Sequence, residues 1–415
     1  MKVGFFTLGC KVNQYETECL SQKLREVGFE IANKGEEADI FVIGSCTVTA
    51  VSDRKTRQMI NRARDYGADF VVLMGCFVDV FREAAAKLKV DLILSNAEKM
   101  KLPELLKERF KLQLKDATEV SVVPQRKAKA FVKIQSGCNR ACSYCIIPKA
   151  RGKSYSKSLV ELQKEVALVA AVGFEEVVLV GINLLLFGKD IGCELIDAVE
   201  LTCCNEKIQR VSLSSLNPEV ITNKMLCRLT LLRKFCPHFH ISLQSGSNNI
   251  LKKMNRSYTV EMYEKIVDNV RNYFEDPSIT TDIIVGFPGE TEADFYDSLE
   301  FVKKMKFAKA HIFPYSKRPG TVAATMEGQV PDKEKERRFK EMQLVVEANQ
   351  MEFNLKMVGK RVCVLLENKC KNGFFKGYAA NYVKVLVKSD EDLKYRFLNV
   401  RITTVQSSGC VGVIE

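Results

Sequence analysis

Hydrophobic positions in the first 110 residues fall into short runs that alternate with longer amphipathic stretches. The apolar runs are Val3–Leu8, Ile40–Ile43, Phe70–Met74 and Leu92–Leu94, and helix-periodic stretches include Glu16–Val27 and Asp53–Tyr66. Short apolar runs are typical of buried strands, whereas apolar residues at spacings of three and four are typical of helices. The alternation predicts an α/β fold whose N-terminal part is a doubly wound parallel sheet with helices on both faces.

The same alternation returns after a polar interval. Residues 111–130 predict a linker, because they are polar and basic and include Pro124, Gln125, Arg126, Lys127 and Lys129. Helical stretches beyond it include Leu159–Val172 and Val260–Tyr273, and the predicted strands are Phe131–Gln135, Glu176–Val180, Gln209–Ser214, His238–Leu243, Thr280–Val285 and Ala310–Pro314. Six strand–helix units predict a central partial (β/α)6 barrel with its active site at the carboxyl ends of the strands.

The last part of the chain changes period. Pro331–Lys356 predicts one long charged helix that begins at Pro331, with Asp332 and Glu334 favoured by the helix dipole in its first turn. Short strands follow it: Arg361–Leu366, Phe374–Tyr378, Tyr382–Val387, Tyr395–Val405 and Gly412–Ile414. Five short strands punctuated by turn residues predict a small antiparallel β-barrel.

Composition and charge narrow the class of protein. The chain has 415 residues, 46% of them hydrophobic, which is enough for two or three domains with real cores. Lys and Arg number 63 against 51 Asp and Glu, a net charge of +12, which excludes an acidic disordered protein and favours a polyanionic partner. Residues 355–415 carry 11 Lys and Arg and 5 Asp and Glu, so half of the chain's net positive charge lies in this segment.

Aromatic residues alternate with the C-terminal charges, and two interpretations stay open. They are Phe374, Phe375, Tyr378 and Tyr382. Either these rings form the core beneath a solvated basic face, or they stack on bases in an RNA-binding barrel.

No targeting or membrane-spanning segment is expected. The apolar run before Leu8-Gly9-Cys10 is too short for a signal peptide, although the tripeptide resembles a lipoprotein cleavage site. The most apolar region, residues 166–188, is interrupted by Glu175, Glu176 and Asn183, so it cannot cross a bilayer. We expect a cytoplasmic protein with reduced thiols and no membrane partner.

The chain contains 15 cysteines, and three of them follow predicted strands of the first sheet. Cys10, Cys46 and Cys76 each stand just beyond an apolar run. Open α/β sheets place ligands at the carboxyl edge of their strands. These three thiols, distant in sequence, are therefore expected to converge.

A second group of cysteines has a compact spacing. Cys138, Cys142 and Cys145 follow the predicted strand Phe131–Gln135 within the stretch Gly137–Cys145. Three thiolates at this spacing can hold an iron–sulfur cluster and leave one iron open to a substrate. The alternative is a zinc knuckle, which requires a fourth ligand, and none of the three histidines (His238, His240 and His311) is near in sequence.

This motif after the first strand of a barrel resembles the radical S-adenosylmethionine (SAM) superfamily, and the resemblance extends along nearly the whole chain. The opening Thr7–Glu16 resembles that of the MtaB-type methylthiotransferases. Further segments similar to this family are Phe239–Ser247, Gly286–Thr291 and Phe313–Thr321, and the basic C-terminal barrel corresponds to its TRAM domain. The occurrence of these segments in this order is highly specific for the family.

The resemblance implies a domain order and two cofactors. It implies a methylthiotransferase domain at 1–115, a radical SAM domain at 125–354 and a TRAM domain at 355–415. Cys10, Cys46 and Cys76 match the ligands of one [4Fe–4S] cluster. Cys138, Cys142 and Cys145 match those of a second, catalytic cluster that binds SAM, and an electron donor such as flavodoxin or ferredoxin is implied.

The implied reaction transfers a methylthio group to C2 of N6-threonylcarbamoyladenosine at position 37, in the anticodon stem-loop of tRNA. A 5′-deoxyadenosyl radical made from SAM abstracts the hydrogen, and a second SAM methylates the sulfur. Three alternatives remain: a MiaB-type enzyme acting on isopentenyladenosine, a RimO-type enzyme acting on a ribosomal protein aspartate, and a non-enzymatic iron–sulfur RNA-binding or redox-sensing protein. Two three-cysteine sites argue against the last, because a sensor cluster normally has every iron ligated.

Contacts to SAM beyond the cluster are predicted at strand ends and turns. The candidates are Tyr144, Gly181, Asn183, Ser212, Ser214, Gln244, Ser245 and Gly286, and for each the alternative is an ordinary turn or core residue. After Asn183 the chain is more apolar than the family pattern. The other cysteines are expected in the core as small apolar side chains: Cys19, Cys193, Cys203, Cys204, Cys227, Cys236, Cys363, Cys370 and Cys410.

Overall fold

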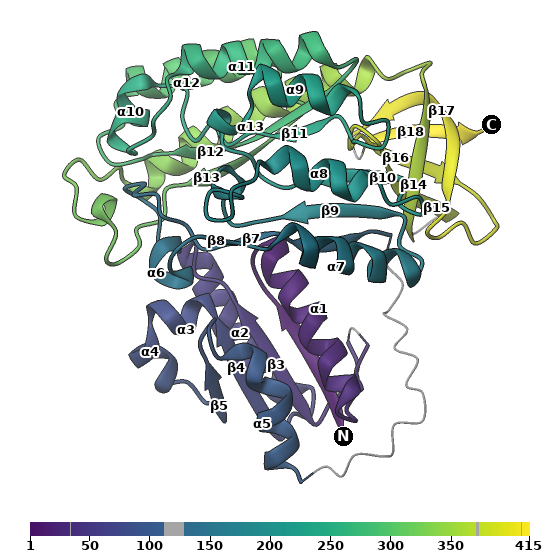
Figure 1. The fold of residues 1–415 in the computed structure, drawn as a ribbon. Coiled ribbons are helices and arrows are strands. Elements are labelled where there is room, and N and C mark those ends of the chain that lie inside the picture. The colour runs from purple at the N-terminus through teal and green to yellow at the C-terminus, as the bar shows by residue number, and fades with distance from the viewer. Residues whose placement is uncertain (34, 112–127, 371–372, 408) are drawn as a thin grey trace. The chain divides into compact units, whose positions relative to one another are not determined.

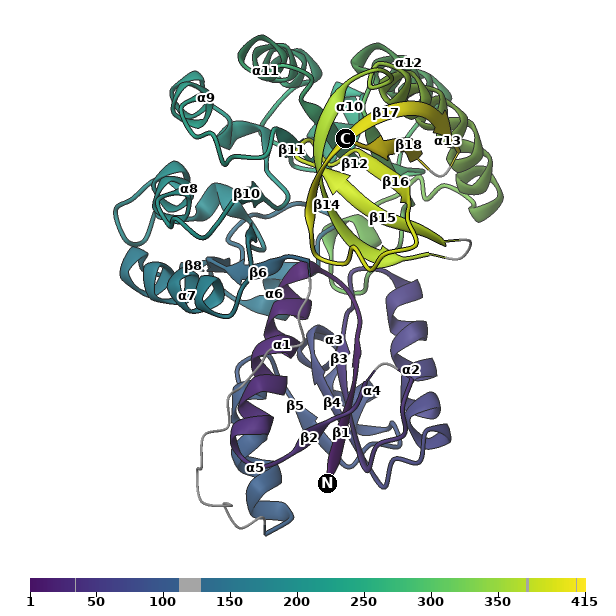
Figure 2. The same cartoon turned by 90° about the vertical axis from the view of Figure 1, so that its right-hand side faces the viewer.

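The computed structural model describes residues 1–33, 35–111, 128–370, 373–407 and 409–415 (Figures 1 and 2). The chain forms two compact units. The first comprises Met1–Gln125, Ser136–Tyr155 and Ser316–Ala324, and the second comprises Arg126–Gln135, Ser156–Tyr315 and Thr325–Glu415. The predicted domain limits at 115 and 125 lie outside the described residues, so the predicted domain boundaries stay a prediction.

The first unit is built on a five-stranded sheet in the order β2-β1-β3-β4-β5, and every neighbouring pair is parallel. Its strands are β1 (Lys2–Thr7), β2 (Glu30–Ile31), β3 (Ile40–Ser45), β4 (Phe70–Gly75) and β5 (Leu92–Leu94). The four apolar runs of the sequence are all strands, and only the two-residue β2 was not predicted. A strand of two residues is too short to leave a periodic signal.

Helices cover both faces of this sheet, as Figure 2 shows for α1 and α2 on opposite sides. The helices are α1 (Lys11–Glu26), α2 (Ala50–Asp65), α3 (Cys76–Val80), α4 (Arg82–Ala86), η1 (Lys99–Lys101) and α5 (Leu102–Arg109), with α6 (Ile147–Arg151) and η4 (Val322–Ala324) from the later segments. One apolar cluster joins α1 and α5 to the sheet through Leu20 and Leu102. The other joins α2 and α3 through Ile60 and Phe77, so each face is buried by its own helices.

The second unit contains six parallel strands in chain order. They form two three-stranded sheets of β6 (Ala130–Lys133), β9 (Glu176–Val180) and β10 (Arg210–Leu213), and of β11 (His238–His240), β12 (Ser278–Val285) and β13 (Lys309–Pro314). Isolated parallel bridges, Val211 with Phe235 and Leu216 with Ile241, link the two sheets. All six predicted strands are present, and the short strands β7 (Gln135–Ser136) and β8 (Tyr155–Ser156) pair separately.

Helices lie along the outside of these strands. They are α7 (Leu159–Ala171), η2 (Leu184–Leu186), α8 (Leu195–Cys203), η3 (Pro218–Val220), α9 (Asn223–Thr230), α10 (Asn248–Lys253), α11 (Val260–Tyr273), α12 (Glu292–Met305) and α13 (Asp332–Leu355). Figure 2 shows α7, α8, α9, α11 and α12 following one another around the strands. One large apolar core joins them, and α13 contributes Met342 and Val346 to it. The fold is thus mixed α/β with parallel sheets.

The C-terminal strands form a closed, mainly antiparallel sheet. They are β14 (Arg361–Lys369), β15 (Phe374–Ala379), β16 (Lys384–Lys388), β17 (Phe397–Gln406) and β18 (Gly409–Ile414), in the order β14-β15-β16-β18-β17. Four pairings are antiparallel, but β16 and β18 pair in parallel, which the prediction of a purely antiparallel barrel did not include. Pairing direction depends on which edges meet, and no residue pattern records it.

Most of the C-terminal aromatic rings are used inside the molecule. Phe375 is fully buried in the barrel core. The Tyr382 ring stacks on the His238 ring at 4.4 Å, and the Lys129 ammonium lies 4.6 Å from the Tyr382 ring and 4.9 Å from the Tyr378 ring. These three rings are therefore engaged within the protein, which favours the interpretation as core residues over base stacking.

Basic residues also connect the C-terminal strands to the central strands. Arg210 of β10 donates to the carbonyl oxygens of Tyr378 and Cys363, both at or under 3.1 Å. Lys129 forms an ion pair of 2.9 Å with Glu367. Both cations are largely buried, so part of the basic charge of this region has a structural role.

Within the described ranges, no helix combines the length and the apolar character that crossing a membrane requires.

Candidate functional site

Three strands of the first unit end in cysteine-bearing loops at one edge of the sheet. Cys10 is the N-cap residue of α1, Cys46 follows β3, and Cys76 is the first residue of α3. Cys46 and Cys76 are buried, whereas Cys10 is exposed. Strands β1 and β3 are neighbours although β2 separates them in the chain, and such a reversal of strand order is where open α/β sheets bind ligands.

Two glycines allow the cysteine loops to approach one another. Gly9 has φ +94°, and a Cβ added there would lie 2.9 Å from the Sγ atom of Cys46. Gly75 has φ +96°, and its Cβ would lie 3.2 Å from the carbonyl oxygen of Ser45. Any larger residue would be strained and would push the loops apart. The glycines that precede Cys10 and Cys76 therefore bring these loops against the end of β3.

The Cys46 thiol interacts electrostatically with the other two cysteines of this triplet. Burial raises the pKa of the Cys46 thiol, and the charges of Cys76 and Cys10 raise it further. Placing three thiolates together is unfavourable without a compensating cation, because like charges disfavour ionisation. A metal centre bound there would provide that compensation, because thiolates are the form that binds metal.

The second triplet lies on a loop of the same unit, between β7 and α6. Cys138 donates its backbone N–H to Gly152 O at 3.1 Å, and Cys145 donates to Cys142 O at 3.0 Å. Gly137, with φ +73°, has no space for a Cβ, which would lie 1.9 Å from the carbonyl oxygen of Lys153. The loop thus folds back on itself and leaves the three thiols half-buried.

The donor sets fit iron–sulfur clusters better than single metal ions. Among the described residues, no three His, Cys, Asp or Glu side chains are grouped closely enough to hold one metal ion. A cubane cluster instead distributes its cysteine ligands over separate irons. Each triplet offers three thiols, which is the number of protein ligands that a four-iron cluster with one open iron would require.

Three of the predicted SAM contacts meet at the ends of β9 and β10 in the second unit. Gly181 donates its N–H to the Ser214 hydroxyl at 3.3 Å. Asn183 donates its N–H to Gln135 Oε1 at 2.8 Å, and its own Oδ1 accepts from Asn217 at 3.2 Å. A Cβ on Gly181 would lie 2.6 Å from the Leu184 side chain. Gly181, Asn183 and Ser214 therefore belong to one ordered network.

The other predicted contacts differ in their surroundings, and two of them, Ser245 and Gly286, are hydrogen-bonded within the protein. Ser212 and Ser245 are buried to 1% exposure or less, and the Ser245 hydroxyl bonds the Ser298 hydroxyl at 3.2 Å. Gly286 donates its N–H to Glu290 at 2.6 Å. Gln244 is half-buried with φ +71°. Tyr144 is half-buried on the cysteine loop of the first unit. Ser245 is therefore better explained as a core residue than as a ligand contact.

The prediction that the remaining cysteines are core residues is wrong for four of them. Cys204, Cys227, Cys363 and Cys370 are exposed, and Cys19 and Cys193 are half-buried, whereas Cys203, Cys236 and Cys410 are buried. Helix α9 shows the reason. Its buried residues are Met225, Leu226 and Leu229, and Cys227 faces the other side of the helix. Composition alone does not reveal which face a cysteine occupies.

Several polar residues at these sites were not predicted. Gln135 and Asn217 bind Asn183, and Lys99 and Arg151 both bind Glu16. Glu16 lies in the opening segment Thr7–Glu16, so the family resemblance of that segment could have identified it as a candidate. Nothing in the sequence distinguishes Lys99 from other lysines, because its partners come from distant parts of the chain.

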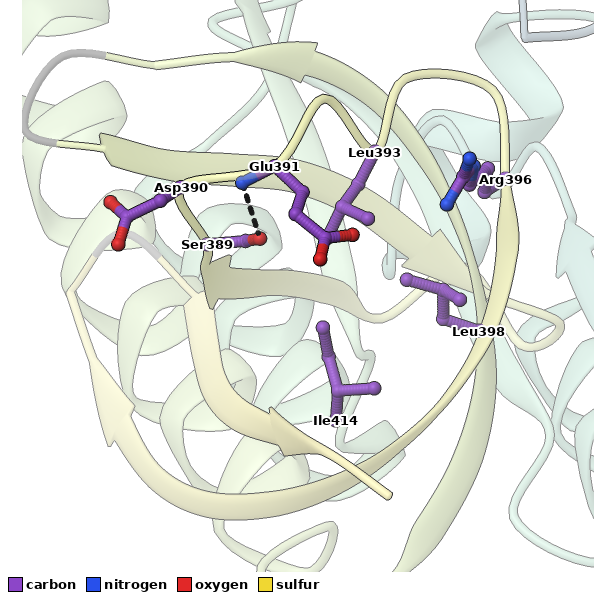
Figure 3. Close-up of a pocket in the computed structure, with 7 residues that line it drawn as sticks. All are labelled: Ser389, Asp390, Glu391, Leu393, Arg396, Leu398 and Ile414. Atoms are coloured by element: carbon purple, nitrogen blue, oxygen red, sulfur yellow. Dashed lines mark hydrogen bonds between the residues drawn. The ribbon is translucent and has the colours of Figure 1, made fainter.

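A pocket of about 480 Å³ lies in the C-terminal barrel, lined by Ser389, Asp390, Glu391, Leu393, Arg396, Leu398 and Ile414 (Figure 3). The Glu391 backbone N–H donates to the Ser389 hydroxyl at 3.1 Å. The Asp390 carboxylate and the Arg396 guanidinium lie at opposite ends of the pocket (Figure 3). Its lining contains none of the predicted site residues.

Comparisons with known families match two segments of the chain. Residues 132–302 match the Radical SAM superfamily. Residues 2–95 match a family described as Uncharacterized protein family UPF0004. The two matches coincide with the central strands and with the first sheet.

Similar curated proteins cover almost the whole chain. One is the threonylcarbamoyladenosine tRNA methylthiotransferase MtaB of Aquifex aeolicus, 37% identical over 89% of this chain and 94% of the relative. The MtaB of Thermotoga maritima is 36% identical over 91% and 89%. A tRNA-2-methylthio-N(6)-dimethylallyladenosine synthase of Caldicellulosiruptor saccharolyticus is 35% identical over 95% and 88%.

Among solved structures, the fold is similar to the radical S-adenosylmethionine methyltransferase TsrM of Kitasatospora setae. That structure contains cobalamin and a [4Fe–4S] cluster. The match has a TM-score of 0.57 at 13% identity and covers 78% of this chain and 76% of TsrM. At this identity the likeness concerns the fold alone.

Proposed function

We propose, from the premise that this chain belongs to the radical SAM methylthiotransferase family, that it adds a methylthio group to C2 of N6-threonylcarbamoyladenosine at position 37 of tRNA. The family membership makes the chain a transferase with SAM and two [4Fe–4S] clusters as cofactors. The single observation that carries the proposal is the presence of two three-cysteine sites in one compact unit. The MtaB proteins of two bacteria support the threonylcarbamoyl substrate.

The six cysteines are proposed as the ligands. Cys10, Cys46 and Cys76 hold one cluster, and Cys138, Cys142 and Cys145 hold the other. When bound, the clusters supply the electron that cleaves SAM and an iron that carries the sulfur. The chain's own contribution is to fix the cysteine loops with glycines at Gly9, Gly75 and Gly137 and to bury two of the six proposed ligands, Cys46 and Cys76.

The other elements receive proposed roles in the same scheme. The six parallel strands form a partial (β/α)6 barrel, with the network of Gly181, Asn183 and Ser214 as the SAM-binding edge. Residues 355–415 form a TRAM domain that contacts the tRNA anticodon stem-loop. Since tRNA is the substrate, the reaction is placed in the cytoplasm, with flavodoxin or ferredoxin as the electron donor.

Mass spectrometry of tRNA nucleosides tests the function directly. Cells that lack the gene are expected to lose 2-methylthio-N6-threonylcarbamoyladenosine and to regain it with the wild-type gene. Cys10→Ala should not restore the nucleoside, whereas Cys204→Ala, an exposed cysteine outside both triplets, should restore it fully. Restoration of 2-methylthio-isopentenyladenosine instead would assign the dimethylallyl substrate, which the Caldicellulosiruptor relative favours. Restoration of neither would reject a tRNA methylthiotransferase.

Iron content tests the ligand assignment separately. Anaerobically reconstituted wild-type protein is expected to hold about eight irons, because each proposed cluster contains four. Replacing Cys10, Cys46 and Cys76 by Ala should leave about four irons. Replacing Cys204, Cys227 and Cys363 should leave the full content. If the variant that lacks Cys10, Cys46 and Cys76 still held about eight irons, these three cysteines would not be cluster ligands.

A further inference from the structure

A buried polar network lies beside the strand-end cysteines, and the proposed chemistry does not use it. Asn13 and Glu16 of α1 are 6% and 4% exposed. The Asn13 side chain donates to Leu8 O at 2.7 Å and to Ser45 O at 3.1 Å, so it joins the loops that carry Cys10 and Cys46. Buried polar side chains persist only when they are hydrogen-bonded, and these are.

Arg151, the last residue of α6, provides the positive charge of this network. Its guanidinium binds both carboxylate oxygens of Glu16, at 2.9 and 3.0 Å, and donates to Asn13 Oδ1. The Arg151 side chain is 2% exposed. This arginine follows the second cysteine triplet in the chain. It therefore fastens the loop of Cys138–Cys145 to the helix that begins at Cys10.

The network continues to Cys76 through two further residues. Lys99 donates to Glu16 at 2.6 Å and to Asn96 Oδ1 at 2.7 Å. The Asn96 amide nitrogen lies 3.6 Å from the Sγ atom of Cys76 and donates to Ala150 O at 2.8 Å. Asn96 thus connects the third thiol of the strand-end triplet to the residue before Arg151.

The network contains two cations, Arg151 and Lys99, and two carboxylates. Both cations bind Glu16, and the half-buried Asp79 accepts from the Asn96 N–H at 2.9 Å and interacts with both cations. Burial opposes the charge of Arg151, but the charges of Cys76, Glu16 and Cys10 outweigh burial and raise its pKa. The Nε atom of Arg151 is buried and has no hydrogen-bond partner among the described residues. The positive charge of Arg151 is therefore held against Asn13, which joins the loops of Cys10 and Cys46, and one residue from Ala150, whose carbonyl oxygen accepts from the Asn96 side chain beside Cys76.

We propose that Arg151 is a positioning residue that holds the two cysteine loops together and makes the reduction potential of the strand-end cluster more positive. This inference rests on the proposed ligand set of that cluster. A buried cation acts through a low local dielectric, so it stabilises the more negative, reduced state of a neighbouring centre. Charge and hydrogen bonding around an iron–sulfur cluster are known levers on its potential.

A purely mechanical role for Arg151 predicts a different pattern. If the guanidinium only fastens α6, then removing Arg151 and removing its partner Glu16 have similar consequences, because either change breaks the same bonds. If its charge acts on the cluster, the two changes shift the potential in opposite directions. Removing Arg151 lowers the local positive charge, and removing Glu16 raises it. The sign of the shift therefore separates the two roles.

The test is a potentiometric titration followed by electron paramagnetic resonance on the full-length chain. Cys138, Cys142 and Cys145 are replaced by Ala in every sample, so the signal comes from the strand-end cluster alone. Arg151→Gln, Lys99→Gln and Glu16→Gln are compared with this background. Lys99→Gln leaves the pair of Arg151 with Glu16 intact and provides a folded variant if Arg151→Gln does not fold.

Arg64→Gln is the matched control. Arg64 also pairs with a carboxylate, Asp91 at 2.7 Å, and its loss removes the same charge. It lies 14 residues into α2, so it is about 21 Å along the helix axis from the end near Cys46. Its replacement is expected to leave the potential unchanged.

The expected result is that Arg151→Gln reduces the ratio of reduced to oxidised cluster at a fixed potential about tenfold, which is about 59 mV for one electron. Lys99→Gln shifts the potential in the same direction by less, and Glu16→Gln shifts it in the opposite direction. If folded Arg151→Gln or Lys99→Gln protein has the same reduction potential as the background, the inference is wrong. It is also wrong if Glu16→Gln shifts the potential in the same direction as Arg151→Gln. Either result would leave the proposed function intact. A background protein without iron would overturn both.

Discussion

Arg318 and Asp53 are 265 positions apart in the chain and form an ion pair of 2.6 Å. The Arg318 side chain is 3% exposed and that of Asp53 13%. Arg318 also donates to the hydroxyl of Thr47 at 2.8 Å, and Thr47 directly follows Cys46. The segment Ser316–Ala324 belongs to the first compact unit through these contacts. One arginine thus fixes the loop of a proposed cluster ligand to the start of α2.

Replacing Arg318 by Met is expected to reduce the free energy of unfolding by about 3–5 kcal/mol, because it leaves Asp53 as a mostly buried charge without its partner. Urea denaturation of the metal-free protein measures the change. Arg64→Met breaks a pair whose members are 38% and 34% exposed, and it should cost at most about 1 kcal/mol. Equal losses in the two variants would show that the Arg318 pair is not buried as the structure has it.

Asn183 is expected to act by ordering the turn after β9. Its Oδ1 accepts from Leu185 N at 3.2 Å and from Asn217 at 3.2 Å. Asn183→Ala should weaken SAM binding about tenfold, or about 1.4 kcal/mol, through loss of this order. Asn183→Asp keeps the acceptor and should bind SAM nearly as well as the wild type. Equilibrium dialysis with SAM gives both values, and weak binding by Asn183→Asp would point to a direct contact instead.

Two lysines of the C-terminal barrel are expected to contact tRNA phosphates. Register places Lys369 opposite Phe375 and Lys388 opposite Phe374, so the two exposed cations flank the start of β15. Replacing both by Gln should lower tRNA affinity and reduce the salt slope of log K by up to about 1.8. Lys303 and Lys304 of α12 are similarly exposed, and their double Gln variant is the control. Identical salt slopes would exclude this end of the barrel as the RNA contact.

Stability at alkaline pH should depend on Cys410. Burial raises the pKa of this thiol from 9.0 to about 11. Because the folded pKa is raised, the contribution of Cys410 to stability is complete below pH 9 and is lost as the pH rises towards 11. Over that interval the wild type should lose about 2 kcal/mol more stability than Cys410→Ala. Denaturation curves from pH 8 to 11 measure this difference, with Cys363→Ala, an exposed thiol of the same barrel, as the control. If the free energy of unfolding falls with pH equally in the wild type and in Cys410→Ala, the pKa of Cys410 is not raised.

Some elements could be predicted almost to the residue. The apolar run Glu176–Val180 is β9 with the same bounds, and the amphipathic stretch Val260–Tyr273 is α11. Both have a strong period and clear ends, such as Thr259, which caps α11 by accepting from Met262 N. The bounds of α1 were less accurate. It begins at Lys11 rather than Glu16, because Cys10 serves as its N-cap and gives no side-chain capping signal.

The candidate site was predictable only in part, for a related reason. A cysteine that follows an apolar run in the sequence is located at the end of a strand by that run. Cys10, Cys46 and Cys76 could therefore be expected at one edge of the sheet. Ser245 and Cys227 could not be placed, because their burial depends on which neighbour covers them. The sequence left open whether the rings of Tyr378 and Tyr382 pack inside the protein or stack on bases, and only the contacts with Lys129 and His238 show that they are used internally.

The sequence by itself determined the alternation of strands and helices, the two cysteine triplets and the basic C-terminal region, because these depend on short-range periodicity, spacing and composition. The tertiary structure alone decided the partners. It brought Arg151 and Lys99 to Glu16 and Arg318 to Asp53, and it paired β16 with β18 in parallel. Each of these buried charges is stabilised by a partner from a distant part of the chain, so no local sequence pattern predicts the pair.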